Sequence, residues 1–217
     1  MSDSTRFAWI MDDSMSRSEA LWDREILRTE RFVAVPSAGS MVAGWTLVVP
    51  RRPMLNLSQT TALEREELDA LATRVADWLG KSGQEVYLFE HGSRAVGSLT
   101  GCGVDQAHLH IVPLPFDLIA VATARAEAGI IWRDAHDTAS PLDALPVEGE
   151  YVAVWSRSDR CTRIGLVTEP VSQWIRRVIA DELGIGAEWN YRSHPHLNQV
   201  LETLAWLRPL RTVAAER

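Results

Sequence analysis

Apolar residues recur along this chain at two spacings, one typical of strands and one typical of helices. Short β-branched runs bounded by turn residues predict strands, and these runs are Arg31–Pro36, Thr46–Pro50, Glu85–Glu90, Asp105–Pro113, Tyr151–Ser156 and Cys161–Thr168. The first two runs are joined through Ser37–Gly44, which predicts a hairpin or an adjacent strand pair.

Other segments carry apolar residues at helical spacing. The predicted helices are Ser18–Glu30, Ser58–Gly80, Phe116–Ala128, Val171–Leu183 and His196–Leu207. Ser58–Gly80 has the clearest pattern, because acidic residues occupy its first turns and glycines follow its end. Asp134–Gly149 contains two prolines among polar residues, which predicts a loop.

The order of these elements predicts an α+β fold. Strands, a helix and further strands follow one another up to Pro115, an order typical of an antiparallel sheet with flanking helices. A chain of 217 residues fits one large domain or a core with an extension. We therefore divide it into a core, residues 1–115, and an α/β extension, residues 116–217, packed on that core.

Composition narrows the class of protein. Hydrophobic residues make up 46% and charged residues 24%, which is typical of a globular chain. The longest apolar runs are too short to span a membrane, and Met1–Asp13 lacks the apolar core of a secretion signal. Two cysteines, Cys102 and Cys161, are too few for a disulfide framework. We expect a soluble cytoplasmic protein without a membrane partner.

Charge argues against a nucleic-acid partner. The net charge is −7 and the pI is about 5.4, whereas binding to duplex nucleic acid requires a basic surface. All but one of the 22 basic residues are Arg, Lys81 being the exception. Guanidinium groups suit bidentate recognition of phosphate, although codon usage in a GC-rich genome gives the same bias.

The candidate chemistry lies in the predicted strand Asp105–Pro113. Alternate residues of a strand share a face, so Gln106, His108 and His110 point one way. Two imidazoles at this spacing lie roughly 6–7 Å apart, given a rise of about 3.3 Å per residue. This distance allows both to serve one reacting centre.

Glycines precede the histidines. Gly97, Gly101 and Gly103 allow the backbone to approach a ligand and to present N–H groups to an anion, with phosphate as the natural candidate. A neutral imidazole is a good nucleophile near pH 7, and its attack on phosphorus forms a phosphoramidate. The spacing of His108 and His110 is equally compatible with a metal site or an incidental polar face.

These residues resemble a known family. Gly101–Pro113, GCGVDQAHLHIVP, resembles the signature of the histidine triad (HIT) superfamily, in which His-x-His-x-His follows a glycine-rich turn. Glu85–Gly92 resembles the strand that leads into that turn, and Arg31–Pro50 with the next helix resembles the order of the preceding elements. The resemblance extends from about Glu25 to Pro115 and implies a HIT-like antiparallel sheet.

The resemblance implies a role for each triad position. His108 takes the middle position, which the family uses as the nucleophile on the α-phosphate of a nucleotide. His110 takes the third position, where it would orient the site and contact phosphate. Gln106 replaces the first histidine, a departure that alters the handling of the leaving group. Trp45 and Pro53 stand where the family often has His, which indicates a divergent substrate pocket.

Substrate-binding residues follow from the same resemblance. Cys102 and Gly103 stand where many members carry Gln and then Ser or Thr, so the backbone of this turn, including Gly101, would contact phosphate. Ser98 and Thr100 are candidates to substitute for the missing side chains, or are ordinary loop residues. His91 would bind phosphate or ribose, or would be satisfied by neighbouring backbone.

The second half resembles extensions of some bacterial HIT-like proteins, notably at Gln173–Arg177 and Trp189–Arg192. Arg176 or Arg192 would reach over the site to bind a phosphate or acid group, or would form a surface salt bridge.

Three functions stay open at this point. The first is a hydrolase or transferase that acts on a nucleotide or nucleotide conjugate through a His108 phosphoramidate, without cofactor or metal. The second is a nucleotide-binding module that has lost turnover. The third is a metal site built from Cys102, His108 and His110, with His91 as a further ligand. The resembled family is commonly dimeric, which makes a homodimer the first assembly to test.

Overall fold

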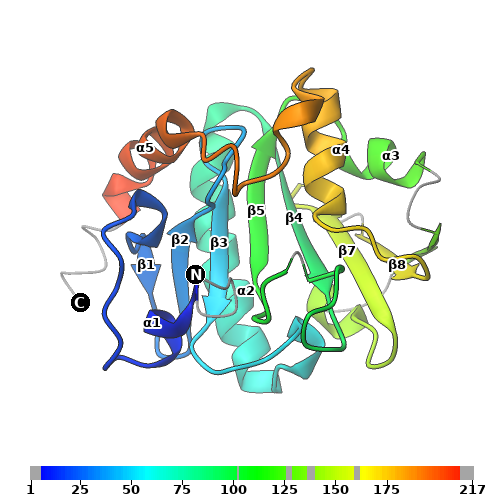
Figure 1. Ribbon diagram of the computed structural model, residues 1–217, viewed down its shortest axis with the longest axis horizontal. Helices are drawn as coiled ribbons and strands as arrows, with labels where there is room; N and C mark the ends of the chain where they lie inside the picture. Colours follow the sequence, from blue (N-terminus) through cyan, green and yellow to red (C-terminus); the bar gives the residue numbers. More distant parts are fainter. Residues whose placement is uncertain (1–5, 102, 126–128, 136–139, 159–161, 211–217) are drawn as a thin grey trace.

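The computed structural model describes residues 6–101, 103–125, 129–135, 140–158 and 162–210. Within these residues, one antiparallel sheet of eight strands runs in the order β1-β2-β3-β5-β4-β7-β8-β6 (Figure 1). The strands are β1 (Leu27–Arg28), β2 (Phe32–Pro36), β3 (Thr46–Pro50), β4 (Glu85–Gly92), β5 (Leu109–Leu114), β6 (Ile130–Asp134), β7 (Glu150–Ser156) and β8 (Thr162–Val167).

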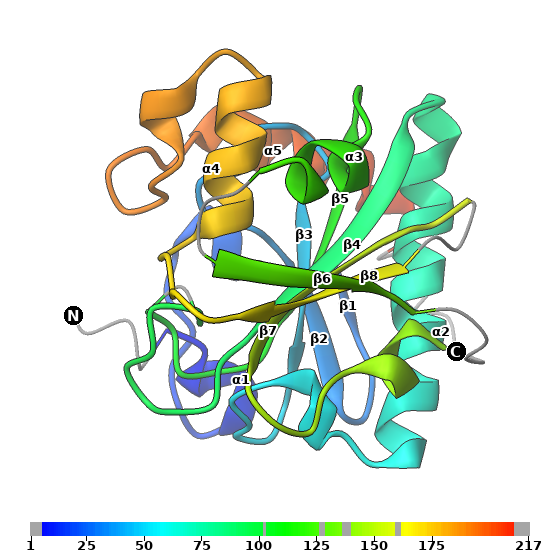
Figure 2. The same cartoon turned by 90° about the vertical axis from the view of Figure 1, so that its right-hand side faces the viewer.

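Helices cover both faces of the sheet. The α-helices are α1 (Ala8–Met11), α2 (Ala62–Leu79), α3 (Leu118–Thr123), α4 (Trp174–Glu182) and α5 (Leu197–Trp206). Short 3-10 turns are η2 (Leu21–Asp23), η3 (Leu57–Gln59), η4 (Gly80–Ser82), η6 (Pro141–Ala144) and η7 (Gly186–Glu188). Figure 2 shows α2 and α4 on opposite sides of the sheet.

The helix α2 begins at a capping box. The Thr61 hydroxyl accepts a hydrogen bond from the Glu64 backbone N–H, and the Glu64 carboxylate accepts one from the Thr61 N–H. The Arg52 guanidinium also donates to Glu64 at 2.6 Å, and it holds the pKa of that carboxyl down at about 2. The helix start is therefore tied to the segment that follows β3.

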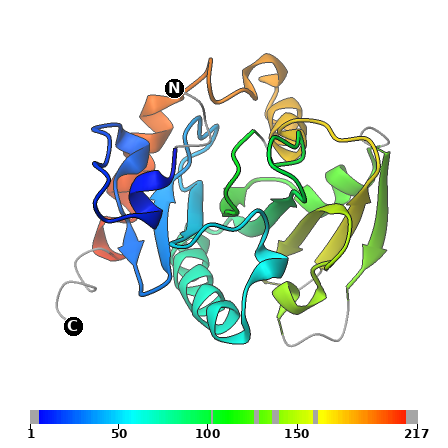
Figure 3. The ribbon, with the colours of Figure 1, turned by 60° about the horizontal axis from the view of Figure 1, so that its bottom comes forward.

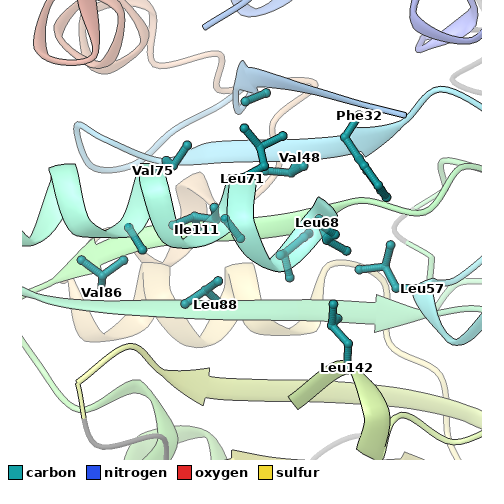
Figure 4. Close-up of a cluster of buried hydrophobic side chains, with 14 of the residues drawn as sticks. Phe32, Val48, Leu57, Leu68, Leu71, Val75, Val86, Leu88, Ile111 and Leu142 are labelled. Carbon is teal, nitrogen blue, oxygen red and sulfur yellow. The ribbon is translucent and has the colours of Figure 1, made fainter. Parts of the chain in front are cut away.

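The main core lies between α2 and the sheet. Leu68, Leu71 and Val75 of α2 are buried against alternate residues of the strands, among them Val48 and Ile111 (Figure 4). Alternation sends the neighbouring strand residues to the other face. Burial of this apolar surface is the main stabilising contribution to the fold.

The other face of the sheet is covered by two separate groups of side chains. Residues of the N-terminal segment, including Phe7 and Ile10, pack on β2 and β3. Residues of α3 and α4, including Ile175, pack on β4 and β7. In Figure 3 the N-terminal segment and the β7–β8 end lie at opposite sides of the molecule, with α2 between them below. The predicted site residues lie between these two groups.

Most predicted elements are confirmed, and three expectations are wrong. The predicted helix Ser18–Glu30 is instead η2 followed by β1, since the Ile26 N–H bonds to the Ala34 carbonyl and draws this segment into the sheet. Asp134–Gly149 is not entirely loop, because β6 ends at Asp134 and η6 follows. The strand predicted from Asp105 begins only at Leu109. Cys161 and residues 126–128 lie outside the described part.

The two halves of the chain share the sheet. The strand β7, from the second half, pairs with β4, from the first, between Tyr87↔Ser156 and Gly92↔Tyr151. The division at residue 115 stays a prediction. In the described part of the chain, no helix is both long and apolar enough to cross a membrane.

Replacing Thr61 with Ala tests the capping box. The variant loses the side-chain acceptor of the Glu64 N–H, so we expect the free energy of unfolding to fall by about 1 kcal/mol. Urea denaturation measures this change. Leu63→Ala, at an exposed position in the first turn, is the matched control and should change stability by less than about 0.5 kcal/mol. Equal losses in both variants would contradict the assignment.

Candidate active site

Three histidines from neighbouring strands lie together on the α4 face. His91 ends β4, His110 lies in β5, and His108 comes directly before β5. The ring centres of His108 and His110 are 4.8 Å apart, and those of His91 and His110 are 6.1 Å apart. His91 and His110 are buried, whereas His108 is half-buried. The structure thus brings together the histidines that the sequence singled out.

A hydrogen bond from Trp45 fixes the tautomer of His110. The indole Nε1–H donates to His110 Nδ1 at 3.0 Å, so the neutral ring carries its proton on Nε2. The His110 ring also stacks on Phe89, with centres 4.2 Å apart. His110 Nε2 is buried and has no hydrogen-bond partner among the described residues. It is therefore a buried donor that no described residue satisfies.

His108 has the opposite tautomer. Its Nδ1 lies 2.8 Å from the carbonyl oxygen of Gln106, and a carbonyl only accepts, so Nδ1 carries the proton. The lone pair of the neutral ring is then on Nε2. At Nε2, one imidazole of the pair is therefore an acceptor and the other a donor.

Burial keeps these rings neutral. It lowers the pKa of His108 to about 4, with the positive charges of Arg6 and Arg176 acting in the same direction and the bond to Gln106 opposing them. Burial and the neighbouring cationic groups also lower the pKa of His110 well below its usual range. At pH 7 the Nε2 lone pair of His108 is therefore available.

His91 supports the start of α4. Its Nε2 accepts a hydrogen bond from the Ile175 backbone N–H at 3.3 Å. Burial, more than the nearby charges, lowers its pKa to about 3. This contact corresponds to the expectation that neighbouring backbone satisfies the ring; a contact of His91 with phosphate or ribose stays a prediction.

Gln106 holds the segment that follows β3. Its amide nitrogen donates to the carbonyls of Pro50 and Arg52, at 3.1 and 3.0 Å, and its amide oxygen accepts from the Met54 N–H at 3.3 Å. The side chain at the first triad position therefore positions backbone, while its own carbonyl orients His108.

The glycine-rich turn is organised by β7. The Thr100 hydroxyl donates to Glu150 at 2.6 Å, and the Thr100 N–H donates to the Ser98 hydroxyl at 3.1 Å. Gly101 lies against Ser93, and Gly103 lies under the Arg192 guanidinium. Substrate binding by Ser98, Thr100, Gly101, Cys102 and Gly103 stays a prediction.

The proposed metal ligands cannot all be placed, because Cys102 lies outside the described residues. Among the residues that are described, no group of three or more His, Cys, Asp or Glu side chains is arranged to hold a metal ion.

Arg176 comes from α4 and lies over the histidine face. The side chain is only 3% exposed, and its guanidinium lies 4.7 Å above the Trp45 ring. It donates to the carbonyls of Trp189 and Gly39. Arg176 is therefore not at the surface, and binding of a phosphate or acid group by Arg176 or Arg192 stays a prediction.

The N-terminal segment also reaches the site, which the sequence analysis missed. The Phe7 ring is 5.8 Å from the His108 ring, and the charge of Arg6 acts on His108. No motif marks this segment, since its role depends on where β2 and β3 place it.

A family model described as a HIT domain matches residues 21–116. Residues 21–116 are therefore assigned as a HIT domain. The HIT domain contains Trp45 and all the triad positions, whereas Arg6 and Arg176 lie outside it. The HIT superfamily is generally one of nucleotide-binding hydrolases and transferases.

A solved structure similar to this chain is the crystal structure of SMU.412c from Streptococcus mutans UA159. The sequence identity is 22% and the TM-score is 0.40, over 51% of this chain and 68% of the other. Comparison with curated proteins gave no match.

A buried acid lies behind the histidine site. Glu90 is 1% exposed and points to the α2 side of β4, where it accepts from the Leu57 N–H at 2.6 Å and bonds to the Tyr151 hydroxyl at 2.7 Å. Burial raises its pKa to about 7 against the opposing effect of these hydrogen bonds. The sequence analysis did not single out this residue.

Substituting Trp45 with Phe tests the tautomer of His110. Without the indole donor, we expect His110 to lose its preference for the Nε2–H form, which ¹⁵N NMR of the imidazole nitrogens measures. Trp132→Phe is the control, because its indole lies on β6 at the far end of the sheet order. An unchanged Nε2–H tautomer in Trp45→Phe would contradict this account.

Glu90 predicts a pH-dependent stability. The folded chain keeps a proton on Glu90 up to about pH 7, while the unfolded chain loses it near its ordinary pKa of 4.5. The free energy of unfolding therefore falls as pH rises through this window, by up to about 3 kcal/mol. The lowered pKa values of His91 and His108 change the stability in the opposite direction. Their contribution to the free energy of unfolding is present above about pH 6.5 and is lost as pH falls below it.

Urea denaturation of wild type and Glu90→Gln from pH 5 to pH 8 separates these effects. As pH rises to about 7, the free energy of unfolding of wild type should fall relative to that of Glu90→Gln, and the difference should then stay constant. Tyr151→Phe removes a hydrogen bond that lowers the Glu90 pKa, so it should move this window to higher pH. A difference in the free energy of unfolding that does not change with pH would contradict the raised pKa of Glu90.

Proposed function

We propose that this HIT protein is a nucleotidyl hydrolase or transferase in which His108 attacks the α-phosphorus of a nucleotide conjugate. The observation that carries the proposal is the pair of opposite tautomers, with a lone pair on His108 Nε2 beside a proton on His110 Nε2. The substrate class expected is an AMP conjugate or a dinucleoside polyphosphate. The acceptor in the second half of the reaction is water, phosphate or another metabolite.

In the first step, His108 Nε2 forms a bond to phosphorus and the bond from phosphorus to the leaving oxygen breaks. The leaving group departs with the electron pair, and a phosphoramidate forms on His108. The acceptor then attacks phosphorus, the P–N bond breaks, and the electron pair returns to Nε2. The acceptor's proton leaves with the solvent, so the imidazole ends as it began.

Hydrogen bonds from the protein stabilise the charges that develop in these steps. The nucleotidylated imidazole is cationic, and its Nδ1–H donates to the Gln106 carbonyl throughout. His110 Nε2–H would donate to a phosphoryl oxygen, which gives the orphaned donor a partner. Gln106 itself has no proton to transfer, because an amide does not titrate in this range.

The second candidate is a nucleotide-binding module without turnover. It is favoured by Gln106 at the first triad position, where the amide is engaged with the backbone of residues 50–54. Both candidates bind a nucleotide, and only the enzyme forms a covalent intermediate.

Mass spectrometry after brief mixing with dinucleoside polyphosphates and AMP conjugates tests the enzyme. We expect an acid-labile nucleotidyl adduct on wild type and none on His108→Ala. His194→Ala, which removes a histidine of the segment after α4, is the matched control and should keep the adduct. Nucleotide binding with neither adduct nor product, across the whole panel, would favour the binding module.

A further inference from the structure

Two buried polar atoms near the start of α4 have no hydrogen-bond partner among the described residues. One is His110 Nε2, which carries a proton, and the other is the side-chain amide oxygen of Gln173. His110 is 3% exposed and Gln173 is 1% exposed, so bulk water does not reach either atom. An unsatisfied buried group lowers the stability of a fold, and it is retained where it serves another purpose.

The backbone at Gln173 is also strained. Gln173 precedes α4 as its N-cap with φ 56° and ψ 36°, in the left-handed region that a residue with a Cβ seldom adopts. Its side chain makes no capping hydrogen bond to the helix. Glycine or asparagine suits this backbone better, so neither helix capping nor backbone geometry explains a glutamine here.

Gln173 lies at the end of α4 that meets the histidines. The Ile175 N–H, in the first turn, donates to His91 Nε2, and the helix runs from there back along β4 (Figure 1). The ring centres of His91 and His110 are 6.1 Å apart. His91 thus links His110 to the start of α4.

Helical spacing places Gln173 on the side of α4 that faces His110. Residues three apart share a helix face, so Gln173 lies on the face of Arg176, one turn closer to the helix start. The Arg176 guanidinium lies 4.7 Å from the centre of the Trp45 ring, and Trp45 donates to His110. The next residue, Trp174, turns the other way, since its ring contacts β6.

The two unpartnered atoms have complementary hydrogen-bond roles. His110 Nε2 donates, so its partner must be an acceptor, such as the phosphoryl oxygen of the proposed reaction. The amide oxygen of Gln173 only accepts, so its partner must carry a proton. An ionised phosphate oxygen has none to offer. A bound anion alone would therefore satisfy His110 and leave the Gln173 oxygen without a partner.

We propose that Gln173 is a ligand-binding residue of the active site, whose amide oxygen accepts a hydrogen bond from a hydroxyl group of the bound molecule. The inference rests on the proposed function and deepens it, because it adds a contact from outside the HIT domain to the triad. The hydroxyl belongs either to the ribose of the nucleotide or to the acceptor that discharges the phosphoramidate. Both sources offer the same O–H donor, and two measurements distinguish them.

Two variants remove the amide by different routes. Gln173→Gly suits the left-handed backbone, and Gln173→Met keeps the length of the side chain while removing an unsatisfied buried oxygen. Neither should lower the Tm measured by differential scanning calorimetry. His196→Gly is the matched control, because His196 is the other non-glycine residue with a left-handed backbone in the described part, at φ 44°, and it precedes α5. A lower Tm in both Gln173 variants, with unchanged ligand binding, would assign Gln173 a structural role and overturn the proposal.

Isothermal titration calorimetry tests the contact without requiring turnover. The probe is AMP, GMP, CMP or UMP, whichever wild type binds most tightly, together with its 2′,3′-dideoxy analogue. If the ribose supplies the hydroxyl, both Gln173 variants should bind the ribonucleotide about fivefold or more weakly than wild type, and the dideoxy analogue equally well. His196→Gly should bind both nucleotides like wild type.

The lifetime of the His108 adduct tests the other source. If the acceptor supplies the hydroxyl, mononucleotide affinity and adduct formation stay as in wild type, and discharge of the adduct slows about fivefold or more in quenched-flow mass spectrometry. Unchanged affinity together with an unchanged lifetime would overturn the role of Gln173. A missing adduct on wild type would refute the proposed turnover alone if affinity still depends on Gln173, and would overturn both proposals if it does not.

Discussion

The pairing of β4 with β7 is the constraint on which the site depends. It continues the sheet of the HIT domain into the second half of the chain, from Tyr87↔Ser156 to Gly92↔Tyr151. Gly92 allows the Tyr151 ring to lie directly against the β4 backbone, where a Cβ would collide with it. With β7 fixed there, the following segments return over the histidine face, and the Ile175 N–H meets His91. The second half of the chain is therefore part of the site's architecture.

Electrostatics at the site differ from those of the whole chain. The net charge is −7, yet the charges of Arg6 and Arg176 act on both His108 and His110. Burial and these charges together keep the imidazoles neutral, and two hydrogen bonds assign their protons. A carbonyl holds the proton on His108 Nδ1, and an indole N–H excludes it from His110 Nδ1. The protonation pattern of the site therefore depends on the hydrogen-bond partners as much as on the histidines themselves.

Much of the fold follows from local sequence patterns. The elements that were predicted wrongly or missed are those that form through pairing with other strands. The helix α2 and the strands β2, β3 and β7 are predictable because their apolar spacing agrees with their final packing. Ser18–Glu30 has helical spacing, but pairing with β2 overrides it. The edge strand β6 was missed because Ile131 and its neighbours lack a buried, alternating pattern.

The candidate site was predictable only in its HIT part. The triad positions are adjacent in sequence, so His108 and His110 could be found from spacing and resemblance. Trp45 departs from the family pattern, which the sequence shows. Its hydrogen bond to His110 depends on the register of β3 with β5, which the sequence does not show. Arg6 and Arg176 lie outside the HIT domain, on either side of it in the sequence, and no local pattern relates them to the triad.

The contacts of the last helices place a condition on how the protein matures. The Gly44 N–H donates to the Thr203 hydroxyl, and Gly39 is held by Pro195 and Arg176. Such long-range contacts form late, and a chain leaving the ribosome folds its N-terminal part first. A nascent HIT domain would thus lack the cover that α4 and the segment after it give to the histidine face. We expect the reactive imidazole to acquire its shielded environment only once nearly the entire polypeptide has been released.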